Sequence, residues 1–440
     1  MTIFLPCDVK EIIEKLNNAG FEAYAVGGCV RDSILGRIPN DWDITTSAKP
    51  MEVKKIFKRT VDTGLKHGTV TVLIGSEGYE VTTYRIDGEY EDGRHPKDVE
   101  FTSNLKEDLL RRDFTINAMA YNDKDGLVDI FGGMEDIEKK VIRCVGNPVE
   151  RFTEDALRLF RAIRFAAQLG YDIEEETYKA IGELAPTLSK ISAERIQTEL
   201  TKTITSDHPE MIKTAYKLGL TKVFMPELDV CFETNQNNPH HCYSVGDHIL
   251  KTVCEVRSDK VLRLAMLFHD MGKPACKTTD EEGIDHFHGH PIKSQEMSKE
   301  ILRRLKYDND TIDKVSRLVR YHDERIEPGE KYMRRAINRV GVVAFPDIFE
   351  VWNADLSGQS EYKREEKFER LNVNKKDYDS IIQKKQCVEL KDMAVTGSDL
   401  IKNGMNPGPE IGKILNEMLM EIIDDPDKND REYLLTKYVK

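Results

Sequence analysis

Three features that would narrow the class of protein are missing from this sequence of 440 residues. No stretch approaches the roughly 18 apolar residues of a membrane-spanning helix. The first residues, MTIFLPCDVKEII, have no basic segment followed by a long apolar run. The eight cysteines are scattered singly without a CxxC pair, which argues against a disulfide framework and a thiolate zinc site. We therefore expect a cytoplasmic protein with reduced thiols and no membrane partner.

An excess of positive charge is missing as well. The 65 Lys and Arg residues face 78 Asp and Glu residues, and the net charge is −13. This balance opposes nonspecific coating of nucleic acid, and no DNA partner is expected, but it leaves room for a local basic groove. The composition is that of an ordinary globular protein. The chain is longer than a domain with a single hydrophobic core usually is, so we expect three or four modules.

Strand signals precede helix signals along the chain. GTVTVLIG (68–75) and YEVTTYR (79–85) are β-branched runs around a glycine turn and predict a hairpin. Residues 43–46 predict another strand. From about Asn147 onward, apolar residues recur at three- and four-residue steps, as in helices. The helical segments are LRLFRAIRFAAQLG, ERIQTELTKTI, HILKTVCEVR, VLRLAMLFHD and EIGKILNEMLMEII.

The segment GGCVRDSILGRIPNDWDI (27–44) places two carboxylates shortly after a glycine turn. Residues two apart in a β-strand point to the same face, so Asp41 and Asp43 would present paired carboxylates. Such hard oxygen ligands suit Mg²⁺, which keeps positions for substrate phosphates. Glu80 in YEVTTYR is the obvious third carboxylate, and this set suits two-metal nucleotidyl transfer. Alone, an Asp-x-Asp is more often a strand edge with solvated acids.

The first half of this segment offers phosphate-binding groups. Gly27 and Gly28 would let the backbone approach phosphate oxygens, and Arg31 could neutralise them. With GG-x-VRD, LG and D-x-D all present, the string resembles the opening motif of the class II tRNA nucleotidyltransferase and bacterial poly(A) polymerase family, within the polymerase-β-like superfamily. The resemblance implies that the two aspartates bind catalytic Mg²⁺ with Glu80 assisting. It places Gly27, Gly28, Arg31 and Asp32 near the triphosphate.

RRDFTINAMAY (111–121) resembles the second motif of this family. The resemblance implies that Arg112, Asp113 and Asn117 face the nucleotide sugar and triphosphate. Independently, Asp113 and Asn117 are four residues apart on one side of a helical turn, where they could bind ribose hydroxyls. A helix boundary with a surface ion pair is the alternative.

The spacing in EDALRLFRAIRF (154–165) predicts one amphipathic helix. Its expected core stripe is Leu159, Ile163 and Ala166, and the other face aligns Glu154, Arg158 and Arg161. A helix with an i,i+4 ion pair is one explanation of this face. The family resemblance implies nucleotide binding instead, with Asp155 and Arg158 pairing with the incoming base.

The chemistry of the bases agrees with that implied role. Cytosine and adenine each present an amino donor beside an unprotonated ring nitrogen, whereas uracil and guanine present a carbonyl beside a ring N–H. A carboxylate only accepts and a guanidinium only donates. Asp155 and Arg158 would therefore admit C and A and reject U and G, at a few kcal/mol per buried mismatch.

Two further segments of the head resemble family elements. FGGMEDIEKKVIR (131–143) resembles the connecting motif, where Gly132 and Gly133 permit a hinge. RIDGEYEDGRHPKDVEF (85–101), which contains Asp87 and Arg94, has the composition of a mobile loop. In the family, a loop at this place is needed for switching from C to A addition, so its presence argues against a CC-only enzyme.

ERIQTEL (194–200) resembles the last neck motif, where we expect Glu194 and Arg195 to make structural contacts. Near the C-terminus, MAVTGSDLIKNGMNPGPEIGKILNEML resembles the tail of many class II enzymes. A helix beginning at PGPEIGKIL could hold an RNA phosphate at its N-terminus, or could have no partner.

Eight of the eleven histidines fall between residues 240 and 322. The order of His248, His269-Asp270 and Asp355 resembles the HD phosphohydrolase superfamily, which implies a divalent metal site. Mixed imidazole and carboxylate ligands suit Mn²⁺, Fe, Ni²⁺ or Zn²⁺ rather than Mg²⁺. His290 and His322 fall where two-metal members add ligands. The superfamily implies phosphodiesterase or phosphatase action, on 2′,3′-cyclic phosphate ends of RNA for example, and a purely structural metal is the alternative.

Together these segments predict an α+β fold with a polymerase-β-like nucleotidyltransferase head, a small mixed sheet with helices, followed by an elongated all-α body that includes an HD domain. Polar breaks at 232–241 and 357–370 favour module boundaries. The expected division is a head at 1–145, a neck for base selection at 146–225, an HD domain at 226–360 and a tRNA-binding tail at 361–440.

The resemblance implies a tRNA nucleotidyltransferase that adds C, C and A to the tRNA 3′ end from CTP and ATP, without a nucleic-acid template. Because the head motifs are shared, an A-adding enzyme and a poly(A) polymerase are the alternatives within the class. From another class comes a metal phosphohydrolase whose head only binds nucleotide. The sequence leaves the oligomeric state and the HD metal undetermined.

Overall fold

The chain forms two compact units, Met1–Phe224 and Met225–Lys440. The computed structural model describes residues 2–87 and 99–439. Part of the predicted loop, including Arg94, lies outside these described residues. The predicted division into four modules is finer than the two units and stays a prediction. Within the described residues, no helix combines the length and the apolar character needed to cross a membrane.

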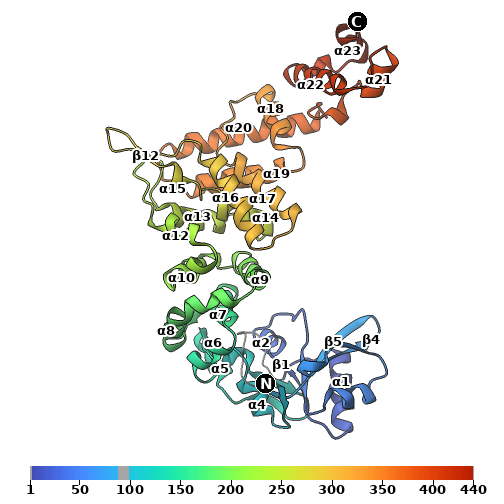
Figure 1. Ribbon diagram of the computed structural model, residues 1–440, viewed down its shortest axis with the longest axis vertical. Coiled ribbons are helices and arrows are strands. Elements are labelled where there is room, and N and C mark those ends of the chain that lie inside the picture. Colours follow the sequence, from blue (N-terminus) through green and yellow to red (C-terminus); the bar gives the residue numbers. More distant parts are fainter. Residues whose placement is uncertain (1, 88–98, 440) are drawn as a thin grey trace. The chain divides into compact units, whose positions relative to one another are not determined.

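A seven-stranded mixed sheet organises the first unit (Figure 1). Its strands lie in the order β3-β4-β5-β2-β1-β8-β9. All neighbours are antiparallel except β2 and β5, which are parallel. The strands are β1 (Ala23–Val26), β2 (Ile44–Thr46), β3 (Thr60–Gly64), β4 (Thr69–Ile74), β5 (Glu77–Thr83), β8 (Met119–Asn122) and β9 (Gly126–Asp129). This sheet with its helices confirms the predicted α+β head.

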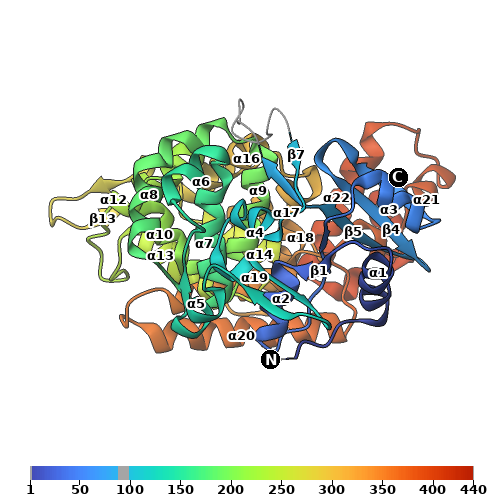
Figure 2. The ribbon, with the colours of Figure 1, turned by 90° about the horizontal axis from the view of Figure 1, so that it is seen from below.

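The predicted hairpin is present as β4 and β5, which lie side by side in Figures 1 and 2. The prediction that Asp41 and Asp43 lie within a strand is wrong, because β2 begins at Ile44. Asp43 nevertheless remains tied to the sheet, since its carbonyl accepts from the amide of Val26 at 3.0 Å.

Eleven helices accompany this sheet in the described part of the first unit. Those of the head are α1 (Cys7–Asn18), α2 (Gly28–Ile34), α3 (Pro50–Ile56), α4 (Leu105–Leu110) and α5 (Gly133–Lys139). Those that follow are α6 (Pro148–Glu154), α7 (Leu157–Leu169), α8 (Glu175–Leu184), α9 (Ala193–Ile204), α10 (Ile212–Lys217) and α11 (Thr221–Phe224). Two small sheets join β6 (Arg85–Asp87) to β7 (Val99–Phe101) and β10 (Val141–Ile142) to β11 (Asp172–Ile173).

The single helix predicted over residues 154–165 is also wrong, because the chain breaks at Asp155 between α6 and α7. Asp155 has an extended backbone, with φ −137° and ψ 101°. Its carboxylate then accepts from the amide of Leu157 at 3.0 Å, near the start of α7. Sequence spacing could not reveal this break, because the apolar residues keep their helical period on both sides of it.

Helices dominate the second unit, as predicted. They are α12 (Pro226–Glu233), α13 (Val245–Glu255), α14 (Lys260–Phe268), α15 (Lys273–Cys276), α16 (His290–Arg304), α17 (Asn309–Tyr321), α18 (Glu330–Val340), α19 (Phe345–Ser357), α20 (Arg364–Gln383), α21 (Gly397–Lys402), α22 (Pro409–Asp424) and α23 (Arg431–Tyr438). The short hairpin of β12 (Thr278–Thr279) and β13 (Asp285–His286) departs from the all-helical prediction.

Candidate functional sites

Three carboxylates gather where the start of β2 lies beside the middle of β5. These strands are parallel, and their register pairs Ile44 with Val81. The preceding residues, Asp43 and Glu80, therefore lie beside each other, one on each chain segment. Asp41 is close enough to influence both, and all three side chains are open to solvent. The sheet thus brings together the three acids that the sequence proposed as metal ligands.

The pKa values of these acids reflect their crowding. Partial burial raises the pKa of Asp43, Arg112 opposes the rise, and Asp41 adds to it. Burial also raises the pKa of Glu80, and the charges of Asp43 and Asp41 raise it further. Carboxylates that disfavour one another's ionisation gain from a cation between them. Their oxygen-only donor set fits Mg²⁺.

A chain of hydrogen bonds runs from the glycine turn to α7. Arg31 donates to the side chain of Asp32 at 2.8 Å and to Asn117 Oδ1 at 2.7 Å. Asn117 Nδ2 donates to Asp113 at 3.1 Å, and Arg161 Nε donates to the other oxygen of Asp113 at 2.8 Å. The predicted nucleotide-binding residues from three separate segments therefore form one connected network.

The electrostatics of this network favour a fixed arrangement. Burial alone would raise the pKa of Asp113, but the charge and hydrogen bonds of Arg161 outweigh it and lower that pKa. The side chain of Asn117 can orient in one way only, because Arg31 requires its oxygen and Asp113 requires its amide nitrogen. Asp113 and Asn117 do lie on one side of a turn, which here is the short 3₁₀ helix Thr115–Asn117.

Gly27 permits a close approach of Arg112 to the turn. A Cβ atom at Gly27 would lie 2.9 Å from Arg112 Nη1, and the φ of this glycine is +86°. Either condition means that a larger residue at position 27 would require the surrounding structure to shift. Asp108, which no sequence pattern singled out, is fully buried, and its carboxylate lies 3.8 Å from Arg112 Nη2. This acid lies on the helix before RRD, and only its burial in the structure distinguishes it from other acidic residues.

Phe165 of α7 is surrounded by three guanidinium groups. The carbons at the centre of the guanidinium groups of Arg31, Arg161 and Arg164 lie 5.1, 5.3 and 4.1 Å from the centroid of its ring. An aromatic face attracts cations at these distances. Phe165 is itself buried against Phe114 in an edge-to-face contact. The ring therefore helps to hold positive charge in place beside the hydrogen-bonded network of Arg31, Asn117 and Asp113.

Asp155 and Arg158, which the sequence proposed as base-selecting residues, both have protein partners. Arg195 donates to the two carboxylate oxygens of Asp155 at 3.2 and 2.8 Å. Arg158 donates to the backbone carbonyl of Arg111 at 2.7 Å and forms an ion pair with Glu154 at 2.7 Å. The expected i,i+4 pair is thus present across the helix break.

The structure requires glycine at both Gly132 and Gly133 of the connecting segment, for different reasons. Gly132 has a left-handed backbone, with φ +78°, just before α5. A Cβ atom at Gly133 would lie 2.5 Å from the carbonyl oxygen of Thr115. The second glycine therefore lets α5 pack directly on the turn that contains Asn117.

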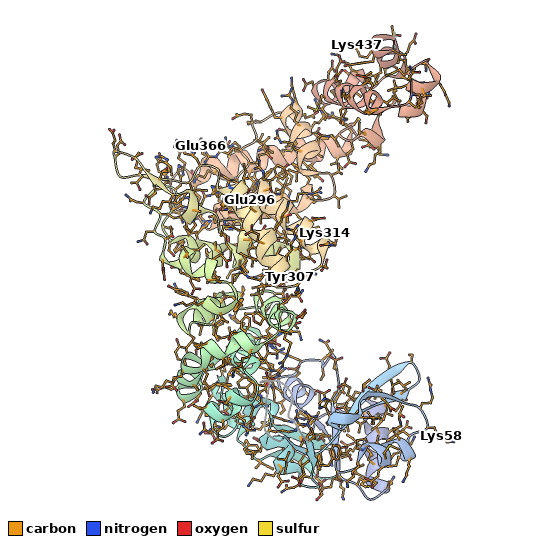
Figure 3. The ribbon with its side chains drawn as sticks, viewed as in Figure 1. Lys58, Glu296, Tyr307, Lys314, Glu366 and Lys437 are labelled. Carbon is orange, nitrogen blue, oxygen red and sulfur yellow. The ribbon has the colours of Figure 1, made fainter. Side chains whose placement is uncertain are left out.

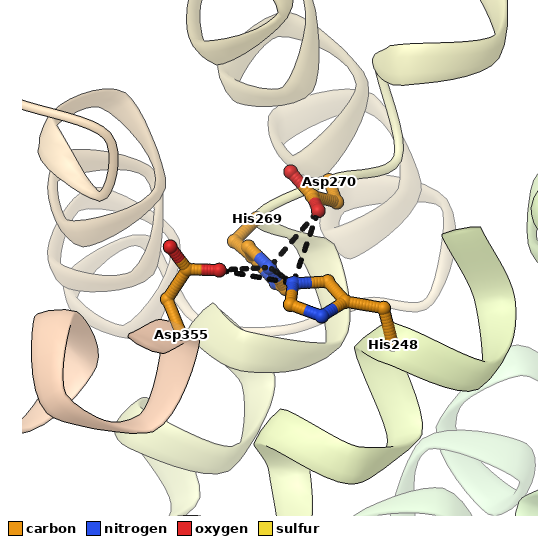
Figure 4. A group of neighbouring side chains, drawn as sticks. All are labelled: His248, His269, Asp270 and Asp355. Atoms are coloured by element: carbon orange, nitrogen blue, oxygen red, sulfur yellow. Dashed lines mark hydrogen bonds and ion pairs between the residues drawn. The ribbon is translucent and has the colours of Figure 1, made fainter. Parts of the chain in front are cut away.

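The second unit contains a buried cluster of histidines and aspartates (Figure 4). His248 Nε2 lies 2.9 Å from Asp355 Oδ1, 3.4 Å from Asp270 Oδ2 and 3.2 Å from His269 Nε2. His269 Nε2 lies 3.2 Å from the same oxygen of Asp270. These four residues come from α13, the end of α14 and α19, as the sequence order predicted. Their donor atoms lie within 4.8 Å of one another, as ligands of one ion would.

The other oxygen of Asp270 faces a second pair of histidines. His290 Nε2 and His322 Nε2 lie 3.3 and 3.4 Å from Asp270 Oδ1, and 3.2 Å from each other. His290 begins α16, and His322 follows α17. Asp270 therefore stands between two ligand groups and offers one oxygen to each. In the described part of the chain, these are the two groups whose ligand atoms lie within 4.8 Å of one another; the carboxylates of Asp41, Asp43 and Glu80 are less compact.

All four histidines present the same nitrogen to this centre. Their Nδ1 atoms lie 2.7 to 3.1 Å from the backbone carbonyls of Gly358, Met266, Phe287 and Val319. Because a carbonyl only accepts, each Nδ1 carries a proton, which leaves each Nε2 facing the centre, where it can bind either a second proton or a metal ion. Two lone pairs 3.2 Å apart repel unless a cation lies between them. The donor chemistry therefore fits two divalent ions of the transition series.

The acids of this centre favour positive charge there. Burial opposes protonation of His269, but Asp270 and Asp355 together raise its pKa to about 10. Lys273, which was not among the residues predicted from the sequence, also belongs to this centre, because its Nζ lies 2.7 Å from Asp270 Oδ2. It lies three residues after Asp270 in HDMGKP, which is the signal that could have identified it.

Comparisons with known proteins agree with both the order and the geometry of these segments. Residues 23–143 match the family described as "Poly A polymerase head domain". Residues 170–232 match "Probable RNA and SrmB- binding site of polymerase A", and residues 290–438 match "tRNA nucleotidyltransferase domain 2". All three ranges lie in the order expected from the motifs.

Complete chains are similar as well. A CCA-adding enzyme of Pediococcus pentosaceus is 36% identical over 97% of this chain and 96% of its own, and one of Limosilactobacillus reuteri is 35% identical over 99% and 96%. The solved structure of the Bacillus stearothermophilus CCA-adding enzyme in complex with CTP is 28% identical, covers 97% of this chain and 96% of its own, and has a TM-score of 0.71. The Thermotoga maritima CCA-adding enzyme complexed with tRNA_CCA, at 22% identity, covers 100% of this chain and 99% of its own with a TM-score of 0.62, and supports the fold alone.

Proposed function

The chain belongs to the family of CCA-adding enzymes, and from this premise we propose that it adds C, C and A to the 3′ end of tRNA. CTP and ATP are the nucleotide substrates, and no nucleic-acid template is used. The observation that carries this proposal is the placement of Asp43 beside Glu80 by the parallel pair β2 and β5, with Asp41 adjacent. This arrangement suits nucleotidyl transfer, and relatives similar over nearly the whole chain support the same activity.

Asp41 and Asp43 would hold two Mg²⁺ ions, with Glu80 assisting. Bound there, the ions would lower the pKa of the tRNA 3′-hydroxyl and neutralise charge on the leaving pyrophosphate. The residues of the chain itself supply binding and orientation. Arg31 and Arg112 would neutralise the triphosphate, the glycine turn would let the backbone approach it, and Asp113 and Asn117 would bind the sugar.

Base selection would depend on Asp155 and Arg158. A carboxylate that accepts from the base amino group and a guanidinium that donates to the ring nitrogen match cytosine and adenine alike. The extended backbone at Asp155 interrupts the helix at this residue, and its carboxylate accepts from the amide of Leu157 at the start of α7. Arg195 would fix the carboxylate in one orientation, since it binds both oxygens.

The test uses three tRNAs that end before CCA, at C, or at CC, with Mg²⁺ and labelled CTP or ATP. We expect two C residues and then one A. Addition of A to the CC end alone would indicate an A-adding enzyme, and an open-ended ladder of A would indicate a poly(A) polymerase. Asp41→Asn and Asp43→Asn should abolish addition, whereas Asp207→Asn, at an exposed acid of the same unit, should not.

A second candidate function, in the second unit, is hydrolysis of phosphate esters at an HD-type site. The observation that favours it is the position of Asp270 between two ligand groups, His248, His269 and Asp355 on one side and His290 and His322 on the other. Two divalent transition-metal ions would be held there, with Asp270 shared. Loss of phosphatase activity in Asp270→Ala with nucleotide addition intact would separate the two sites. A metal-loaded chain without hydrolysis would indicate the structural alternative.

A further inference from the structure

One carboxylate of the first unit is buried completely and has no role in the proposed mechanism. Asp108 lies on α4, and 0% of its side chain is exposed. A buried charge is costly unless it is paired and hydrogen-bonded. Burial alone would raise the pKa of this carboxyl, but the charges of Arg111 and Arg112, with the hydrogen bonds that the carboxylate accepts, lower it. Asp108 is therefore ionised at neutral pH, next to two arginines of the RRD motif.

The two oxygens of this carboxylate have different partners. Oδ1 accepts from Nε of Arg111 at 2.9 Å and pairs with Nη2 of the same guanidinium group at 2.8 Å. Oδ2 accepts from the hydroxyl of Thr45 at 3.0 Å and lies 3.8 Å from Nη2 of Arg112. Thr45 belongs to β2 and lies two residues after Asp43. One side chain thus connects the strand that follows the candidate metal ligands with both arginines of RRD.

Arg112 is paired with Asp108 only loosely. Among the residues that the structure describes, Asp108 is the one acid with a carboxylate oxygen within 4.0 Å of the Arg112 guanidinium group. The distance of 3.8 Å is too long for a hydrogen bond, and Nε of Arg112 is buried without a hydrogen-bond partner. Burial lowers the pKa of Arg112, and the charge of Asp108 opposes this effect. The carboxylate therefore attracts the guanidinium group without occupying its hydrogen-bond donors.

Arg111 is held from two sides, which fixes the backbone just before Arg112. Its side chain is bound by Asp108, and its carbonyl oxygen accepts from Arg158 Nη2 at 2.7 Å. Arg158 is the residue proposed to donate to the incoming base. The contacts of Asp108 therefore extend from β2, through the end of α4, to the group proposed for base selection.

We propose that Asp108 is a positioning residue for nucleotidyl transfer, which aligns Arg112 with the triphosphate and ties it to the strand that follows Asp43. The inference rests on the proposed function and deepens it, since Arg112 is the group proposed to neutralise the triphosphate. Asp108 does not touch the nucleotide in this role. Without its charge, Arg112 still attracts the triphosphate but is no longer aligned with the charge that develops during transfer. The rate of the chemical step therefore depends on Asp108 more than the affinity for the nucleotide does.

Steady-state kinetics of C addition to a tRNA that ends before CCA test this role. Asp108→Asn keeps the size of the side chain and removes its charge. We expect it to lower kcat per folded chain roughly 10- to 100-fold, while the KM for CTP changes less than about three-fold. Asp285→Asn is the matched control for loss of a buried acid, because Asp285 of the second unit is 3% exposed and also binds one cation and one threonine hydroxyl. Glu296→Gln, at an exposed acid of α16 that Figure 3 labels, controls for the change in net charge. Both controls should keep the wild-type kcat.

A double-mutant cycle with Arg112→Ala separates positioning from a structural role. Because Asp108 acts through Arg112, Asp108→Asn should cause no further loss of kcat in the Arg112→Ala background. An equal factor of loss in both backgrounds, or an unchanged kcat in Asp108→Asn alone, would overturn the proposal and leave the proposed function standing. Thr45→Val removes the hydroxyl that holds Asp108 Oδ2, and it enters the same cycle, with the same two outcomes, if Asp108→Asn does not fold. A wild-type chain that adds nucleotide to none of the three tRNAs would refute the proposed function itself.

Discussion

Arg195 of α9 donates to both carboxylate oxygens of Asp155, at 3.2 and 2.8 Å, at the break between α6 and α7. The pair is largely enclosed, with 23% and 17% of the two side chains exposed. A carboxylate held at both oxygens has a defined orientation toward a base. Given the proposed role of Asp155 in base selection, we expect Arg195 to act as a positioning residue for nucleotide choice, a sharper role than the structural contact that the neck motif implied.

Replacement of Arg195 tests this role. In Arg195→Ala the preference for CTP over UTP, measured as the ratio of kcat/KM values, should fall by about 10-fold, because a mobile carboxylate rejects the wrong base less strongly. Lys202→Ala on the same helix, at an exposed residue, should leave the ratio unchanged. An unaltered preference in Arg195→Ala, with reduced stability alone, would reduce the pair to a structural contact.

Because the pKa of Asp43 is raised in the folded chain, we predict that replacement of Asp43 stabilises the fold while it abolishes nucleotide addition. A carboxyl whose pKa is raised by folding destabilises the fold when ionised, and this cost is present above the folded pKa and disappears as the pH falls through it. Asp43→Asn should therefore raise the unfolding free energy of the metal-free chain at pH 7, by less than about 1 kcal/mol because the carboxylate is open to solvent. The gain should shrink toward pH 4.

Urea unfolding followed by circular dichroism at both pH values measures this difference. Asp207→Asn serves as the control, since Asp207 is exposed and outside the carboxylate group. A loss of stability at pH 7 in Asp43→Asn would contradict the repulsion inferred among Asp41, Asp43 and Glu80.

Phe165→Leu should weaken nucleotide binding through the three guanidinium groups around the ring. Removal of the aromatic face loosens Arg31 and Arg161, so the KM values for CTP and ATP should rise several-fold. Phe224→Leu is the matched control, because Phe165 and Phe224 are both 5% exposed and Phe224 stacks on Phe160 instead. Both variants should lose about 1–1.5 kcal/mol of stability. Equal KM values in the two variants would exclude the positioning role of Phe165.

Removal of metal should destabilise the second unit. In the metal-free chain the Nε2 atoms of His248 and His269 face each other at 3.2 Å, and those of His290 and His322 do the same. Mn²⁺ at 100 times its dissociation constant should add about 2.7 kcal/mol per site and raise the thermal midpoint. Elemental analysis should find two ions per chain, and fewer in Asp270→Asn. His208→Ala, at an exposed histidine outside the cluster, should keep both. A thermal midpoint that does not change when a chelator removes the metal would contradict a metal centre.

The sequence by itself indicated which residues could carry chemistry in each unit. Two patterns in the sequence depend on residue type alone. They are the spacing of Asp41 and Asp43 after a glycine turn and the order of His248, His269 and Asp270. The spacing of apolar residues along the chain likewise predicted the hairpin and the helical body. It failed at Asp155, because a break of one or two residues leaves the period of the neighbouring helices intact.

Only the tertiary structure decided which of these groups meet. The parallel register of β2 and β5 places Glu80 beside Asp43, and the packing of α13, α14, α16, α17 and α19 gives each oxygen of Asp270 its own pair of histidines. Asp108 illustrates the limit most clearly, because in the charged run KEDLLRRD it looks like any solvated acid. Its contact with Thr45 depends on how α4 packs, and distances between elements far apart in the chain are set by burial of their side chains rather than by sequence spacing.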